Sequence, residues 1–371
     1  MRNLSILFAV IVAMVSCQPG NSFQINGSIA DPAYEGTTVY LQQSKGREMI
    51  NLDSATVTQG AFKMSGTADT VKVLYLSLDR SVNQGQMSRS LVVVEPGKIN
   101  VKVDEGFAVS GTKLNDAYDI YNKSQEEIGK ELRVISEKFQ SATQDGTMTD
   151  ELREELMGEY DKQYKVITDQ TKEFIKSNVG NELGKFMFLT SASNFDIDAQ
   201  KEILALADDA FKADENVQKI IKRLEQAERV AIGQQFIDFT MKDPAGNDVS
   251  LSDYAGKGKV VLIDFWAAWC GPCRQEMPNV VAAYDKYKSK GFEVVGVSLD
   301  RNTEEWEKGI ADLKMTWPQM SDLKFWETPV VELYAFRGIP HTVLLDAEGK
   351  IIEKDLRGKA LEDKLEELLG S

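Results

Sequence analysis

Cysteine and histidine are scarce in this chain, which has three cysteines and one histidine among 371 residues. A structural zinc site takes about four nitrogen or sulfur ligands, so metal binding is excluded as the main role. Basic residues are also in deficit, with 43 Lys and Arg against 58 Asp and Glu and a net formal charge of -15. Because binding to nucleic-acid phosphates needs a basic face, no nucleic-acid partner is expected.

Long apolar segments are missing as well. After residue 22 no run reaches the roughly 18 apolar residues that a membrane helix needs. Leu4 to Val15 is apolar but too short to span a bilayer, and Met14 to Cys17 resembles a bacterial lipobox. That resemblance implies a lipoprotein signal peptide and tether over residues 1–22, with a lipid on Cys17. The alternative is an ordinary signal peptide with a leftover cysteine, and in both cases the protein leaves the cytosol.

Three regions with different patterns follow the N-terminus. Residues 23–111 contain short apolar runs between Gly, Asn and Pro, which predicts an antiparallel β-sandwich-like accessory domain. Residues 112–232 have apolar residues at helical spacing, which predicts a helical region. Residues 233–371 alternate apolar strands with helices, which predicts an α/β domain with a mixed central sheet flanked by helices.

The expected elements of the last two regions can be given by residue range. In the helical region two long helices separate at Asp145-Gly146 and shorter ones follow at 182–192, 197–208 and 215–229. Their apolar stripe either forms a dimer seam or packs within the chain. In the last region the expected strands are 236–241, 259–265, 292–299, 342–345 and 351–355, with helices after Cys273, at 303–313 and at the C-terminus.

Two of the three cysteines, Cys270 and Cys273, lie between an expected strand and an expected helix. A disulfide that closes so small a loop restricts the unfolded chain very little, so stabilisation explains the pair poorly. Redox exchange needs two neighbouring thiols at a helix start, where the helix dipole and free amide groups stabilise a thiolate. The pattern therefore favours thiol-disulfide chemistry.

The segment from Asp264 to Cys273, DFWAAWCGPC, resembles the active-site segment of thioredoxin. Pro278 lies where that family kinks its first active-site helix, and Gly338-Ile339-Pro340 is similar to the TlpA and ResA branch of envelope thiol-disulfide oxidoreductases. The resemblance covers the C-terminal region and implies a thioredoxin-like fold for residues 233–371.

The same resemblance implies roles for the residues of the motif. Cys270, at an exposed position, would be the attacking thiolate, and the more buried Cys273 would resolve the mixed disulfide. Gly271 and Pro272 allow a tight turn, and in thioredoxin this dipeptide accompanies a reducing potential. Trp269 is expected at the surface, where it could contact substrate.

Two further positions follow from the resemblance. Pro340 matches the cis-proline that lies beside the dithiol, where the backbone of Ile339 would pair with a substrate chain. His341 departs from the threonine that is common there, and two interpretations stay open, either a charge near Cys270 or packing.

Asp264 ends an apolar strand, so its carboxyl is expected to be shielded from water. Burial raises a carboxyl pKa, which suits a proton acceptor for Cys273. The alternative is an aspartate that only forms local hydrogen bonds.

The expected function is an envelope enzyme that reduces disulfides in exported proteins. No cofactor is required, and a membrane reductase would supply the electrons because the chain has no second cysteine pair. A disulfide isomerase that dimerises through the N-terminal regions is one alternative. A thiol peroxidase is less favoured, because Ala267 and Ile263 stand where peroxidases of this fold have threonine and proline. A non-catalytic binding protein is a third alternative.

Overall fold

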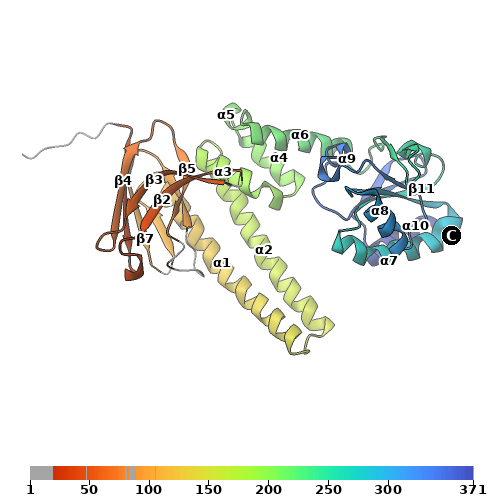
Figure 1. The fold of residues 1–371 in the computed structure, drawn as a ribbon, viewed down its shortest axis with the longest axis horizontal. Coiled ribbons are helices and arrows are strands. Elements are labelled where there is room, and N and C mark those ends of the chain that lie inside the picture. The colour runs from red at the N-terminus through yellow and green to blue at the C-terminus, as the bar shows by residue number, and fades with distance from the viewer. Residues whose placement is uncertain (1–19, 47, 80–81, 83–88, 105, 371) are drawn as a thin grey trace, which may run out of the picture. The chain divides into compact units, whose positions relative to one another are not determined.

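The computed structural model describes residues 20–46, 48–79, 82, 89–104 and 106–370 (Figure 1). The chain divides into two compact units, one up to Asp214 and one from Glu215 onward. None of the helices in these ranges combines the length and hydrophobicity that crossing a bilayer requires. Cys17, the expected lipidation site, lies outside the described residues.

The first unit opens with two four-stranded sheets whose inner faces share one apolar core. Ile25 from one sheet and Leu76 from the other are both fully buried in it, which confirms the sandwich. The strand orders are β4-β1-β7-β8 and β3-β2-β5-β6. The strands are β1 (Ser22–Ile29), β2 (Thr38–Lys45), β3 (Glu48–Thr56), β4 (Ala61–Thr67), β5 (Lys72–Ser77), β6 (Arg89–Val94), β7 (Gly97–Val103) and β8 (Phe107–Ser110).

The sandwich differs from the expected antiparallel one in a single pairing. Strands β1 and β7 are parallel neighbours, with Ile25 opposite Ile99, while the other pairs are antiparallel. Local sequence cannot reveal this pairing, because it joins the first and the seventh strand across most of the domain. The first sheet is therefore mixed.

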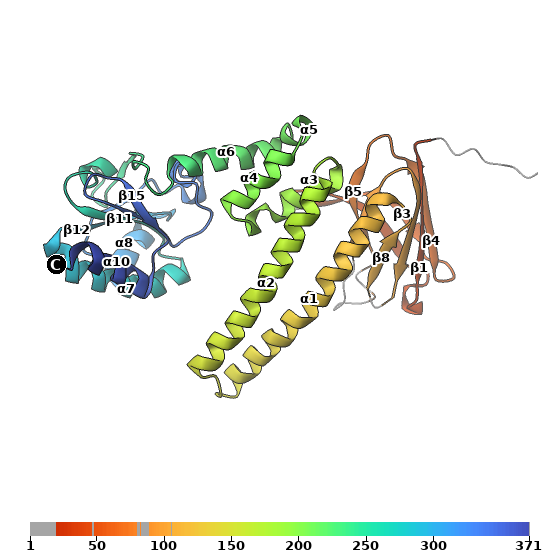
Figure 2. The same ribbon diagram turned by 180° about the vertical axis from the view of Figure 1, so that it is seen from behind.

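The helical part of the first unit starts with a long antiparallel hairpin, whose two helices lie side by side in Figures 1 and 2. The ring of Tyr121 stacks on that of Phe174 at 4.5 Å, and the Tyr121 hydroxyl lies 2.9 Å from the Thr171 hydroxyl. The turn falls at Asp145-Gly146, as expected. The helices are α1 (Lys113–Gln144), α2 (Asp150–Asn178), α3 (Glu182–Ser191), α4 (Ile197–Leu206) and α5 (Asp209–Lys212).

The second unit is built on a seven-stranded mixed sheet in the order β10-β9-β13-β12-β11-β14-β15. Its strands are β9 (Thr240–Lys242), β10 (Asp248–Ser250), β11 (Val260–Trp266), β12 (Phe292–Ser298), β13 (Gln319–Ser321), β14 (His341–Leu345) and β15 (Ile351–Lys354). Its helices are α6 (Glu215–Arg229), α7 (Gly271–Tyr287), α8 (Thr303–Asp312), α9 (Pro329–Leu333) and α10 (Gly358–Leu369). This is the thioredoxin-like arrangement that the sequence led us to expect.

Strand β11 is buried along its whole length, which requires cover on both faces of the sheet. Alternate residues of a strand point to opposite faces. The indole of Trp266 donates to Gln319 Oε1 at 3.0 Å, whereas the ring of Phe265 packs on the other face against Tyr334 and Phe336, at 5.3 and 4.6 Å between centroids. Asp264 therefore shares a face with Trp266.

Helix α6 belongs to the second unit, so that unit starts earlier than residue 233. The Gln226 amide donates to the Leu333 carbonyl at 2.7 Å, and Val230 is fully buried in the core of this unit. The predicted boundaries of the domains themselves stay predictions.

The strand expected at 236–241 is shorter in the structure. Only Thr240–Lys242 forms β9, since the residues before it run as a loop whose Phe236 amide donates to Gly349 at 3.0 Å.

Candidate functional site

The dithiol lies where β11 ends and α7 begins. Cys270 and Cys273 form a disulfide, and Cys270 is the N-cap of α7, since the Cys273 amide donates to its Sγ at 3.2 Å. An amide at a helix N-terminus is the donor that stabilises a thiolate after reduction. Gly271 and Pro272 occupy the exposed first turn between the two cysteines.

Cys270 is less exposed than the sequence suggested. Its exposed fraction is 4% in this oxidised form, against 1% for Cys273. Cys270 is the more exposed of the two cysteines, as expected, but the prediction that it lies at an exposed position is wrong. The cover comes from the loop before β14, where the Ile339 carbonyl oxygen lies 3.6 Å from Cys270 Sγ. The Ile339-Pro340 peptide bond is cis, so both residues lie beside the dithiol.

Asp264 is buried in the middle of β11, between Gly296 of β12 and Thr342 of β14. Burial, and secondarily the negative charge of Glu276, raise its pKa from 3.8 to about 7, although Arg357 acts in the opposite direction. Among the described residues its Oδ2 has no hydrogen-bond partner. A carboxyl with such a pKa exchanges protons near neutral pH, as a base for a thiol requires.

Glu276 and Arg357 are part of the site, although neither role was predictable from the sequence. Glu276 lies on α7, and its Oε1 accepts from the Gly358 amide at 2.7 Å. Arg357 donates from Nη2 to the Pro340 carbonyl at 2.7 Å. The turn after β15 thus contacts both the dithiol helix and the cis-proline loop, a relation that no local sequence signal indicates.

The two tryptophans of the motif have different environments. Trp266 is fully buried, while Trp269 is 47% exposed, which confirms the expected surface position of Trp269. The loop amide of Ala268 between them donates to both carboxylate oxygens of Asp300, at 3.2 and 3.0 Å. Asp300 was missed, although it follows the apolar strand β12 at the sheet edge where the dithiol lies.

His341 is a packing residue in the structure. Its ring stacks on Phe336 and Phe265, at 5.0 and 5.7 Å between centroids, and Nδ1 lies 2.7 Å from Asp355 Oδ1. No contact between His341 and Cys270 is found in the described residues, so the geometry favours the packing interpretation.

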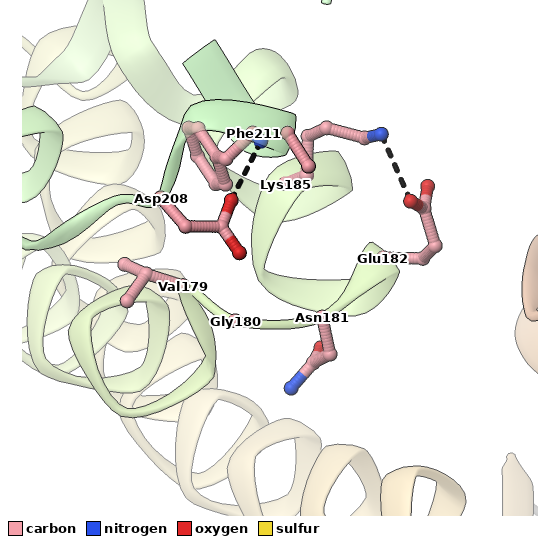
Figure 3. Close-up of a pocket in the computed structure, with 8 residues that line it drawn as sticks. Val179, Gly180, Asn181, Glu182, Lys185, Asp208 and Phe211 are labelled. Carbon is pink, nitrogen blue, oxygen red and sulfur yellow. Dashed lines mark hydrogen bonds and ion pairs between the residues drawn. The ribbon is translucent and has the colours of Figure 1, made fainter. Parts of the chain in front are cut away.

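A small cavity of about 80 Å³ lies in the first unit, far along the chain from the dithiol (Figure 3). Asp208 accepts from the Phe211 amide at 2.8 Å, Asn181 accepts from the Gly184 amide at 3.1 Å, and Lys185 pairs with Glu182 (Figure 3). These groups cap helices or pair with each other, so they serve the fold.

Comparison with known proteins gives two family matches. Residues 232–354 match the AhpC/TSA family, and residues 23–118 match a domain of unknown function, DUF4369. The first match contains Asp264, Cys270, Cys273, Glu276 and Pro340, and it ends before Asp355, Arg357 and Gly358.

Individual relatives each match a little over a third of this chain. The thiol-disulfide oxidoreductase ResA of Bacillus thuringiensis is 32% identical over 142 residues, which cover 38% of this chain and 79% of the relative. ResA of Oceanobacillus iheyensis is 35% identical, over 36% of this chain and 69% of the relative. The thioredoxin domain of a thiol-disulfide oxidoreductase from Bacteroides vulgatus has 43% identity, covering 38% of this chain and 98% of that domain, with a TM-score of 0.35.

Proposed function

Because the chain belongs to the ResA-type family of thiol-disulfide oxidoreductases, we propose that it reduces disulfides in exported proteins through Cys270 and Cys273. The observation that carries this proposal is the placement of Cys270 Sγ between the Cys273 amide, at 3.2 Å, and the Ile339 carbonyl, at 3.6 Å. The amide stabilises the attacking thiolate, and the carbonyl marks the backbone along which a client chain would align.

The reaction starts from the reduced enzyme. The Cys270 thiolate attacks one sulfur of a client cystine, so a mixed disulfide forms as the client S–S bond breaks, and the first client thiolate leaves and takes up a proton. Cys273 then loses its proton to the Asp264 carboxylate and attacks Cys270 Sγ, which releases the second client thiolate. The client gains two electrons, and the enzyme ends with the Cys270-Cys273 disulfide.

The oxidised enzyme needs two electrons before the next turnover. Cys17 is the one cysteine outside the pair, and it is assigned to the lipid in our proposal, so the electrons come from a membrane dithiol reductase. We place the protein in the bacterial envelope, facing the periplasm and tethered through Cys17. Labelling of cells with a radioactive fatty acid tests the tether, because wild type should carry the label and Cys17→Ser should not.

Trapping tests the reductase function. Cys273→Ser removes the resolving thiol, so clients should stay disulfide-bonded to Cys270. These complexes should migrate as high-mass species on a non-reducing gel and disappear when dithiothreitol is added. The matched control, Cys270→Ser with Cys273→Ser, should trap none. If the single variant captures no protein in cells while wild type is folded, clients are not reduced through this dithiol.

A disulfide isomerase is the second candidate, and the hairpin of α1 and α2 favours it. Three apolar side chains of this hairpin are at least half exposed, namely Ile120 at 71%, Val134 at 50% and Met157 at 54%. A second copy of the chain would cover such side chains. Two dithiols in one assembly could then isomerise a client. A monomer in sedimentation equilibrium, or failure to refold a scrambled ribonuclease, would exclude this candidate.

A further inference from the structure

An aromatic and guanidinium stack extends outward from the dithiol. The ring of Trp269, the residue before Cys270, lies 5.1 Å from the ring of Phe325. The Cζ atom of Arg301 lies over the Phe325 ring, 3.9 Å from its centroid. Trp269 and Arg301 are exposed and Phe325 is partly buried, so the stack forms part of the surface next to the attacking cysteine.

The backbone holds Phe325 in this position at a conformational cost. Its φ is +57°, which is unfavourable for a residue with a bulky side chain. The turn is fixed by its neighbours, since the Leu323 amide donates to Ser321 Oγ at 3.1 Å and the Lys324 amide to Asp322 Oδ1 at 3.2 Å. A strained conformation held by its surroundings is typical of functional sites.

Arg301 keeps its hydrogen-bonding capacity in this arrangement. Stacking on an aromatic ring uses the face of the guanidinium, whereas its N–H donors lie in the plane and match a carboxylate. In the described part of the chain Arg301 has no ion pair, and the carboxylate of the preceding residue, Asp300, points inward to the Ala268 amide and the Ser298 hydroxyl. Its charge is thus available to a ligand.

Arg274 places a second guanidinium beside the same segment. Its Nη1 donates to the Ala268 carbonyl at 3.5 Å, and the residue is exposed. Two exposed arginines therefore flank Trp269 in a chain whose net charge is -15. The net negative charge of the chain repels acidic proteins at long range. Long-range attraction therefore does not explain why two arginines lie at this position.

We propose that Arg301, Phe325 and Trp269 form a docking surface that selects client segments with an acidic residue near the attacked cysteine. This inference rests on the proposed reductase function. The ring spacings place the guanidinium of Arg301 within about 9 Å of the Trp269 ring, or two to three residues of extended chain at about 3.3 Å each. Because Trp269 directly precedes Cys270, which attacks the client, we expect the client carboxylate about three residues from the attacked cysteine.

Single-turnover kinetics of the reduced full-length protein test this. The probes are two peptide disulfides with Asp or Lys placed three residues from the cysteine on both sides, together with hydroxyethyl disulfide, which has no flanking chain. Wild type should react about tenfold faster with the Asp peptide than with the Lys peptide, and Arg301→Gln should lower this ratio to about twofold. Phe325→Leu, which removes the stacking platform, should act in the same direction.

Lys324→Gln is the matched control, because it removes an exposed positive charge, 3.9 Å from Asp322 Oδ2, from the same turn without replacing a residue of the stack. It should keep the tenfold ratio, and hydroxyethyl disulfide should react equally with all variants. A wild-type ratio near one, with normal reduction of hydroxyethyl disulfide, overturns the docking surface but leaves the reductase function intact. An equal fall in Lys324→Gln and Arg301→Gln also overturns it, and inertness toward all three disulfides refutes both proposals.

Discussion

Asp264→Asn should change how the stability of the second unit depends on pH. The folded carboxyl has a pKa of about 7 against 3.8 in the unfolded chain, so between these values the folded chain binds a proton that the unfolded chain has lost. The stabilisation contributed by protonated Asp264 is therefore fully present below pH 4 and is lost as pH rises through 7. Since each pKa unit is worth about 1.4 kcal/mol, ionised Asp264 destabilises the fold by about 4 kcal/mol.

Asparagine resembles the protonated carboxyl in shape but never ionises. The free energy of unfolding of Asp264→Asn should equal that of wild type near pH 4 and exceed it by about 4 kcal/mol at pH 8. All five tryptophans lie between residues 266 and 326, so tryptophan fluorescence during urea unfolding of the oxidised full-length protein reports on this unit alone. Titrations that are common to both proteins cancel in the difference.

Asp312→Asn is the control, because it removes an exposed carboxylate from the same unit. Its difference from wild type should stay small and independent of pH. If the difference for Asp264→Asn is as flat between pH 4 and 8 as that of the control, Asp264 does not titrate in this range, and its role as base for Cys273 is refuted.

Three other changes should have measurable effects. Gly309→Ala should destabilise the second unit by about 1 to 3 kcal/mol in urea unfolding, because the added Cβ would lie 2.7 Å from Ala268 Cβ and 3.1 Å from the Trp266 ring; Ala268→Gly should restore only part of the stability. Asn115→Ala should lower the free energy of unfolding by about 3 kcal/mol, measured by circular dichroism, since it leaves the buried amide and carbonyl of Val93 without partners; an unchanged free energy would contradict this. Glu276→Gln removes a charge that raises the pKa of Asp264, so the pH midpoint described above should fall; a rise would be inconsistent.

Elements with a strong local pattern were predictable from the sequence. The apolar run that became β11 and the helix at Glu215–Arg229 lie where they were expected, because periodicity encodes which faces are buried. Strand β3 was not identified, since its residues are exposed on nearly every position and show no alternation. Strand β13 has three residues, too few for any period to be visible.

The chemical centre of the site was predictable, but its surroundings were not. Cys270, Cys273 and Pro340 are recognisable because their spacing resembles a known motif. Arg357, Asp300 and Phe325 reach the site through the fold, from segments 30 to 90 residues away whose local sequence resembles ordinary loops. Asp300 alone had a usable signal, its position after a buried parallel strand.

If Cys17 carries the proposed lipid, the early start of β1 limits how far the sandwich can lie from the membrane. The first strand begins at Ser22, so only four residues separate it from Cys17. Fully stretched, the chain between these two residues covers no more than about 18 Å. With the proposed acyl chain on Cys17, the first strand of the sandwich would therefore stay within about that distance of the lipid headgroups.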